Sequence, residues 1–111
     1  MKVDKPWGHE IRWAINEKYL GKILFISRGK RLSKQYHNVK DETIYVLAGI
    51  LVLEIGEEGT RHILKEGDSY RIEPKTIHRF CAPIDCSVKL IEVSTPEIDD
   101  VVRISDDYGR D

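Results

Sequence analysis

The stretch that decides the fold runs from Gly29 to Gly49 and reads GKRLSKQYHNVKDETIYVLAG. Two β-rich segments within it, residues 33–37 and 43–47, flank the turn-forming residues 38–41. Successive side chains on a strand point to opposite faces, so Gln35 and His37 face the same side. If the chain reverses at residues 38–41, Glu42 lies opposite His37 on the neighbouring antiparallel strand. The stretch therefore predicts a strand reversal that gathers three polar side chains on one face.

Short β-rich segments bounded by turn residues recur along the rest of the chain, and no segment has the apolar spacing of an amphipathic helix over three turns. The expected strands are residues 10–15, 19–27, 33–37, 43–47, 50–55, 61–64, 69–72, 78–82 and 87–94. This many short strands favours an all-β antiparallel sandwich, jelly roll or small barrel, and such folds enclose a pocket. The segment after Pro96 is expected to form a short helix or an arm over the barrel.

The composition is typical of one folded domain, residues 1–111. Of the 111 residues, 41% are hydrophobic and 33% are charged, and this length holds one core. Lys and Arg number 18 against 19 Asp and Glu, so net charge gives no reason to expect a nucleic acid or a membrane as partner. The apolar runs are far shorter than the roughly 20 residues of a membrane helix, and the first residues do not lead into a signal peptide. We therefore expect a soluble, cytoplasmic protein.

A second segment, residues 67–78, reads GDSYRIEPKTIH and delivers a further histidine, His78, at the start of a strand. An amide oxygen, two imidazoles and a carboxylate form a mixed oxygen and nitrogen donor set suited to a borderline divalent ion such as Zn, Mn, Co, Fe or Ni. We therefore predict a site for one divalent metal ion, zinc foremost, at Gln35, His37, Glu42 and His78.

The two segments resemble the paired motifs of the cupin superfamily, whose fold is a jelly-roll barrel, or double-stranded β-helix. The matching positions are Gln35, His37, Glu42 and Gly49 in the first motif and Gly67, Pro74 and His78 in the second. Two positions depart from the pattern: Gly29 lies one residue close to its expected place, and Thr76 replaces the second glycine of the second motif.

Gln-x-His in place of the usual His-x-His resembles the cupin domain of type II mannose-6-phosphate isomerases, which often follows a mannose-1-phosphate guanylyltransferase domain. Further segments resemble that family: KPWG at residues 5–8, LSKQYH at 32–37, IEV at 91–93 and DDVVRISDDYGR at 99–110. The resemblance covers nearly the whole chain. Because 111 residues leave no length for the transferase domain, we expect the isomerase-like part without guanylyltransferase activity.

The resemblance implies a metal-dependent isomerase that interconverts mannose 6-phosphate and fructose 6-phosphate or a related pair of sugar phosphates. Such a reaction needs a Lewis acid at the carbonyl and a base that moves a proton between C1 and C2. The catalytic candidates are Glu42, Lys40 and Arg103, with Glu10 as another carboxylate that could act as the base. For the phosphate, Lys5, Lys40, Arg79, Arg103 and Arg110 are available, and we expect substrate binding by Lys5, Arg103 and Arg110.

Two departures from the family bear on activity. The family usually has arginine where Lys40 stands, and lysine keeps the charge but not the planar fork that suits a phosphate. Residues 43–45 read TIY where the family usually has His-Trp, which is consistent with a different sugar.

Other functions remain open because one fold hosts many of them. The alternative is a metal-binding cupin without isomerase activity that acts as a sugar-binding or regulatory module. A metal-free sugar epimerase of this architecture is another alternative, and the metal content of the protein would distinguish it from the isomerase. A dioxygenase that binds iron with three histidines is disfavoured by Gln35. Open sheet edges and faces favour a homodimer.

Overall fold

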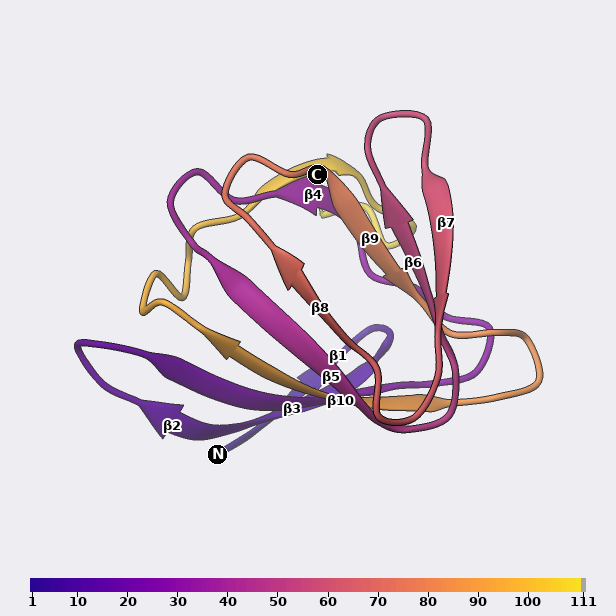
Figure 1. Ribbon diagram of the computed structural model, residues 1–111, viewed down its shortest axis with the longest axis horizontal. Coiled ribbons are helices and arrows are strands. Elements are labelled where there is room, and N and C mark those ends of the chain that lie inside the picture. Colours follow the sequence, from indigo (N-terminus) through magenta and orange to yellow (C-terminus); the bar gives the residue numbers. More distant parts are fainter. Residues whose placement is uncertain (111) are drawn as a thin grey trace.

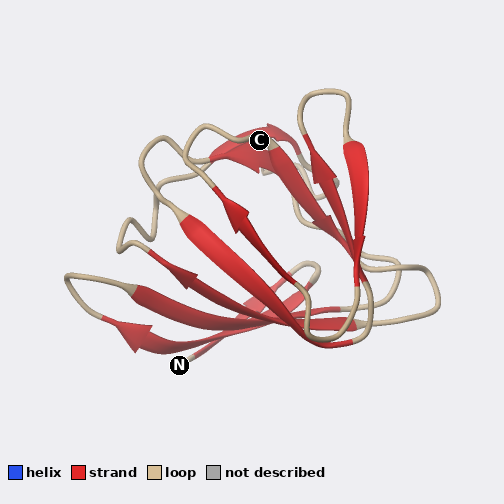
Figure 2. Ribbon diagram, viewed as in Figure 1, coloured by secondary structure: helices blue, strands red, loops and turns tan. Residues whose placement is uncertain are grey.

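The computed structural model describes residues 1–110, which form eleven strands and no helix. In chain order the strands are β1 (Lys2–Lys5), β2 (Gly8–Ile15), β3 (Leu20–Ile26), β4 (Lys34–Tyr36), β5 (Glu42–Ala48), β6 (Leu51–Ile55), β7 (Thr60–Leu64), β8 (Ser69–Ile72), β9 (His78–Cys81), β10 (Val88–Ser94) and β11 (Val102–Ser105). All nine predicted strands form, with small shifts at their ends. Figure 2 shows the described chain as strands joined by loops.

The strands form two antiparallel sheets that face each other across the interior (Figure 1). One has six strands in the order β1-β2-β3-β10-β5-β8, and the other has five in the order β11-β4-β9-β6-β7. Strand β10 inserts between β3 and β5, and β9 between β4 and β6, so these neighbouring strands are distant in sequence. This arrangement confirms the predicted all-β jelly roll.

The predicted reversal between residues 37 and 42 is wrong in one respect. Strand β4 belongs to the five-stranded sheet, where it pairs with β9 and β11, whereas β5 belongs to the six-stranded sheet, where it pairs with β10 and β8. Residues 38–41 therefore carry the chain from one sheet to the other. His37 and Glu42 meet across the interior rather than on neighbouring strands.

The ends of the chain add two strands that the sequence did not predict. Strand β1 pairs with β2 at one edge of the six-stranded sheet, and β11 pairs with β4 at one edge of the five-stranded sheet. Of the two forms expected after Pro96, the structure has the arm, which lies along β4. No helix in the described chain is long and apolar enough to cross a membrane.

The interior changes from apolar to polar along the six-stranded sheet. Leu24, Leu90 and Val46 lie side by side on β3, β10 and β5 and are almost fully buried. Two residues further toward the other end of the barrel, Lys22 pairs in register with Glu92, and both are also buried. Charged side chains placed on an inward face have to be paired or to line a cavity. The interior is thus hydrophobic around Leu24, Leu90 and Val46 and polar around Lys22 and Glu92. We call this polar part of the interior the polar chamber.

Candidate metal centre

Three buried side chains from different parts of the chain converge in the polar chamber. His37 follows β4, Glu42 begins β5 and His78 begins β9. The Nε2 atom of His37 lies 3.1 Å from Glu42 Oε1, and Nε2 of His78 lies 3.3 Å from the same oxygen. One ligand atom from each residue lies within 4.8 Å of the other two. This spacing lets one small cation contact all three.

Backbone carbonyl groups fix the orientation of both imidazoles. His37 Nδ1 donates to the carbonyl of Asp100 at 2.5 Å, and His78 Nδ1 donates to the carbonyl of Thr76 at 2.8 Å. A carbonyl only accepts, so in a neutral imidazole the proton sits on Nδ1 and the lone pair sits on Nε2. Both Nε2 atoms therefore turn toward Glu42, as metal-binding histidines are held by carbonyl groups in other proteins.

The donor set fits a divalent cation. Within the described residues, Oε2 of Glu42 is buried and has no hydrogen-bond partner. Burial favours the neutral acid, but the contacts with His37 and His78 and the charge of Lys40 hold the pKa of Glu42 well below its usual range. An ionised carboxylate facing two imidazole lone pairs needs a cation or extra protons between them. Gln35 lies beside this group, because it pairs in register with His78.

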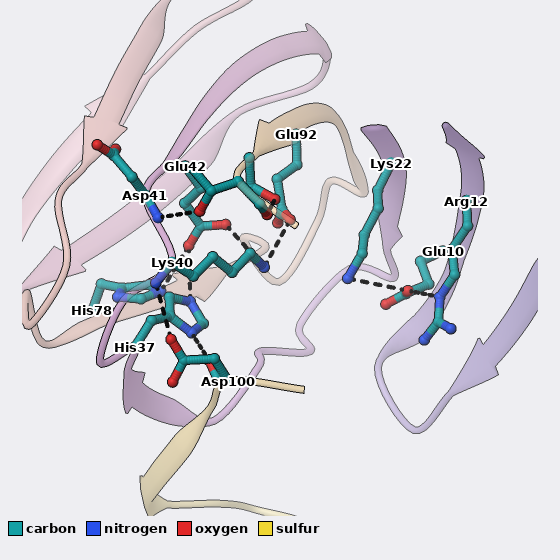
Figure 3. A network of polar contacts seen from close by, with 12 residues as sticks. Glu10, Arg12, Lys22, His37, Lys40, Asp41, Glu42, His78, Glu92 and Asp100 are labelled. Carbon is teal, nitrogen blue, oxygen red and sulfur yellow. Dashed lines mark hydrogen bonds and ion pairs between the residues drawn. The ribbon is translucent and has the colours of Figure 1, made fainter. Parts of the chain in front are cut away.

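Lys40 links Glu42 to a second buried carboxylate (Figure 3). Its Nζ donates to Glu92 Oε2 at 3.1 Å and lies 3.7 Å from Glu42 Oε2. Burial lowers the pKa of Lys40, but Glu92 and Glu42 outweigh it and raise that pKa above its usual value. Burial and the charge of Glu42 raise the pKa of Glu92 to about 7.

The chamber is a cavity of about 280 Å³. It is lined by all eight residues predicted for metal binding, catalysis or substrate binding, namely Lys5, Gln35, His37, Lys40, Glu42, His78, Arg103 and Arg110. Arg79, one of the cations considered for the phosphate, lies elsewhere. Its Nε donates to the carbonyl of Leu32 and its Nη2 to Asp107, so it braces the wall rather than facing the cavity.

A second charged cluster, which the sequence did not predict as a unit, lines the cavity on β1, β2 and β3. The Glu10 carboxylate accepts a hydrogen bond from Arg12 Nε at 2.7 Å and lies 3.4 Å from Lys22 Nζ and 3.9 Å from Lys5 Nζ. Figure 3 shows Glu10, Arg12 and Lys22 as a group separate from the histidines. The alternation of inward and outward side chains could have revealed these charged residues from the sequence. Lys22 on β3 and Glu92 on β10 occupy inward positions of otherwise apolar strands.

The C-terminal arm closes one side of the cavity with Ile98, Asp99, Val101, Arg103 and Arg110. Besides its carbonyl bond to His37, Asp100 accepts three backbone N–H bonds from residues 38–40 through its carboxylate, which lower its pKa to about 2. Asp107 pairs with Arg31 at 2.7 and 2.9 Å, and Tyr108 donates to the carbonyl of Arg31. The arm is therefore attached to the barrel at both of its ends.

Comparison with known sequences identifies close similarity to one family. Residues 1–106 match the family described as mannose-6-phosphate isomerase C-terminal. A mannose-1-phosphate guanylyltransferase from Salmonella montevideo is 32% identical over 112 residues, which cover 98% of this chain and 23% of that protein. The chain thus spans about a quarter of the length of the curated relatives that it matches.

Comparison with solved structures confirms the cupin fold. A cupin resembling RmlC from Shewanella frigidimarina superposes with a TM-score of 0.76 at 18% identity, over 89% of this chain and 86% of that chain. A sugar phosphate isomerase of the cupin superfamily from Silicibacter pomeroyi gives a TM-score of 0.70 at 21% identity, over 78% of this chain and 58% of that one. The barrel is therefore the double-stranded β-helix that the motifs predict.

Proposed function

Because the chain belongs to the family of mannose-6-phosphate isomerase C-terminal domains, we propose that it is a metal-dependent sugar-phosphate isomerase. The expected substrates are mannose 6-phosphate and fructose 6-phosphate. One observation carries the proposal: the Nε2 atoms of His37 and His78 converge on Oε1 of the buried Glu42 carboxylate, inside a cavity rich in cations. The cupin isomerase from Silicibacter pomeroyi supports a reaction of this class.

His37, Glu42 and His78 would hold the divalent ion, with Gln35 as a fourth ligand. When bound, the ion supplies Lewis-acid polarisation of the substrate oxygens and stabilises the enediolate charge. The carbonyl groups of Asp100 and Thr76 keep the two imidazoles oriented for this role. Zinc is the proposed metal on the basis of the mixed oxygen and nitrogen donors.

The remaining task is to move a proton between C1 and C2. The Lys40–Glu92 pair is suited to it, because both groups line the cavity and share a hydrogen bond of 3.1 Å beside Glu42. A proton can then be taken from one carbon and returned to the next without leaving the pair. In this assignment Glu42 binds the metal and does not act as the base. Arg103, which forms no ion pair with residues 1–110, is left to bind the substrate.

The test is a coupled assay on purified protein with its metal content measured, across several hexose 6-phosphates. We expect turnover with mannose 6-phosphate and its loss on removal of the metal by a chelator. Absence of turnover with every hexose phosphate, in protein that holds a full equivalent of metal, would rule out the isomerase. Tight binding of a sugar phosphate in that case would favour the alternative of a binding or regulatory module.

A further inference from the structure

The cavity carries more positive charge than the rest of the chain. Six cationic side chains line it against four carboxylates, an excess of two positive charges before any metal is bound. The cations are Lys5, Arg12, Lys22, Lys40, Arg103 and Arg110, and the carboxylates are Glu10, Glu42, Glu92 and Asp99. The whole chain has a formal charge of −1. The excess is therefore a property of the cavity, and it favours an anionic ligand.

The excess is concentrated away from the histidines, in the cluster around Glu10. One carboxylate there faces three cations, and the side chains of Lys22 and Glu10 are only 10% and 6% exposed. Burial, with the charges of Arg12, Lys22 and Arg110, lowers the pKa of Lys5 despite the opposing charge of Glu10. Glu10 holds the cations together but neutralises only one of them. Within residues 1–110, no carboxylate other than Glu10 lies within ion-pair distance of Lys5, Arg12 or Lys22.

Strand register gives the separation between this cluster and the metal ligands. Lys22 pairs with Arg12 on one side and with Glu92 on the other. Glu42 lies on β5, two strands from Lys22 across β10. Glu92 pairs with Ile44, two residues from Glu42, so two strand spacings and this offset place Lys22 and Glu42 about 12 Å apart, and both side chains point into the chamber between them. An open-chain hexose phosphate has a similar length from its carbonyl end to its phosphorus atom.

We propose that Lys22, together with Lys5 and Arg12, forms a subsite for a phosphate monoester dianion. The phosphate end of the sugar lies against β1, β2 and β3, and the carbonyl end lies at His37, Glu42 and His78. Several charged donors match the three outer oxygens of a phosphate. Placement of the carbonyl end rests on the proposed function, whereas the phosphate subsite follows from the charges and contacts of the cluster.

The experiment compares the binding of mannose 6-phosphate and of mannose to metal-loaded protein by calorimetry. Lys22→Met keeps the length of the side chain and removes its charge, Lys22→Arg keeps the charge, and Lys89→Met is the control on the outer face of the same sheet. We expect Lys22→Met to weaken binding of the phosphorylated sugar about tenfold or more, the loss of one charge-assisted hydrogen bond. Lys22→Arg and Lys89→Met should bind nearly as wild type does.

Metal content and thermal unfolding of each variant separate a lost subsite from a lost fold. Should Lys22→Met fail to fold, Arg12→Gln replaces it in the experiment, and it too should weaken binding of mannose 6-phosphate about tenfold or more. Undiminished binding of mannose 6-phosphate by a folded, metal-loaded variant would overturn the subsite. Because binding of mannose 6-phosphate does not depend on turnover, an inactive wild-type protein that still needs Lys22 for mannose 6-phosphate would overturn the isomerase and leave the subsite standing.

Discussion

At the scale of single residues, the two histidines offer the most direct test of the site. His37→Ala and His78→Ala each remove one Nε2 atom that faces Glu42, so each variant should hold much less than one equivalent of metal after dialysis, as measured by elemental analysis. His62→Ala is the matched control, because His62 packs against Tyr70 outside the cavity. Full metal content in both variants would refute the site.

Lys40 has a structural role that can be measured separately from catalysis. It lies between the buried carboxylates of Glu92 and Glu42, at 3.1 and 3.7 Å. Lys40→Met leaves both without their counter-ion and should lower the free energy of unfolding by about 3 kcal/mol in metal-free protein. Adding Glu92→Gln to that variant should recover part of the loss, and chemical denaturation measures both. If the losses of the two single variants simply add in the double variant, the pair is not coupled.

The residues of the site differ in how far the sequence reveals them. His37, Glu42 and His78 follow from motif spacing, although the wrong partner strand was predicted for Glu42. Glu92 and Lys22 have no motif of their own, but they interrupt the inward apolar positions of β10 and β3. Their roles depend on which strand lies opposite. That information is absent from local periodicity, because pairing in a jelly roll joins residues far apart in the chain.

At the scale of elements, the same reason explains why β1 and β11 were missed. Both are four-residue strands at sheet edges, with little buried apolar surface, and they form because β2 and β4 offer free hydrogen-bonding edges. Longer, more apolar strands such as β5 and β10 carry their own signal of alternating burial. The sequence therefore predicts the elements that build the core better than those that complete the edges.

The C-terminal arm should contribute stability that depends on pH. Hydrogen bonds from Arg31, with the charges of Arg31 and Arg79, hold the pKa of Asp107 below its usual 3.8. An acid whose pKa is lowered by folding stabilises the fold at pH values above its pKa in the unfolded chain. It loses that effect as the pH falls through its pKa in the folded protein. Asp107→Asn should therefore cost about 1 kcal/mol near pH 6, and the difference from wild type should shrink toward pH 2. Thermal unfolding across this range is the measurement.

Asp85→Asn is the control for the arm, since Asp85 forms no ion pair within residues 1–110. It should unfold at the wild-type temperature at every pH. A difference between Asp107→Asn and wild type that is the same at pH 6 and pH 2 would show that the carboxylate charge of Asp107 does not stabilise the attached arm.

At the scale of the whole molecule, the six-stranded sheet turns an apolar face to the outside. Ile11, Ile23, Ile91 and Tyr45 form a continuous row across β2, β3, β10 and β5. Of the residues that face outward from these four strands, Lys89 is the one that carries a charge. An apolar face with a single charge can pack against a second copy of itself, which is what a two-fold contact between identical copies requires.

The size of this face reaches the lower bound expected for a specific dimer contact. Strands about 4.8 Å apart and about seven residues long give a face on the order of 500 Å² per copy, so two copies would bury on the order of 1,000 Å². We therefore expect a homodimer in which the outer faces of the six-stranded sheets pack together while the cavities stay on the inner side. Val93, on β10, lies within this face and is 46% exposed.

Val93→Glu places a charge in the expected contact and should convert the dimer to a monomer, as measured by sedimentation velocity. The glutamate would have to be desolvated opposite a second copy of itself, which opposes association. Ile84→Glu is the matched control, because Ile84 is 87% exposed on a loop after β9, away from the face. A dimer that survives Val93→Glu, or one that Ile84→Glu dissociates, would place the contact elsewhere. Mannose 6-phosphate binding should persist in the monomer, since every predicted ligand of the cavity comes from one chain.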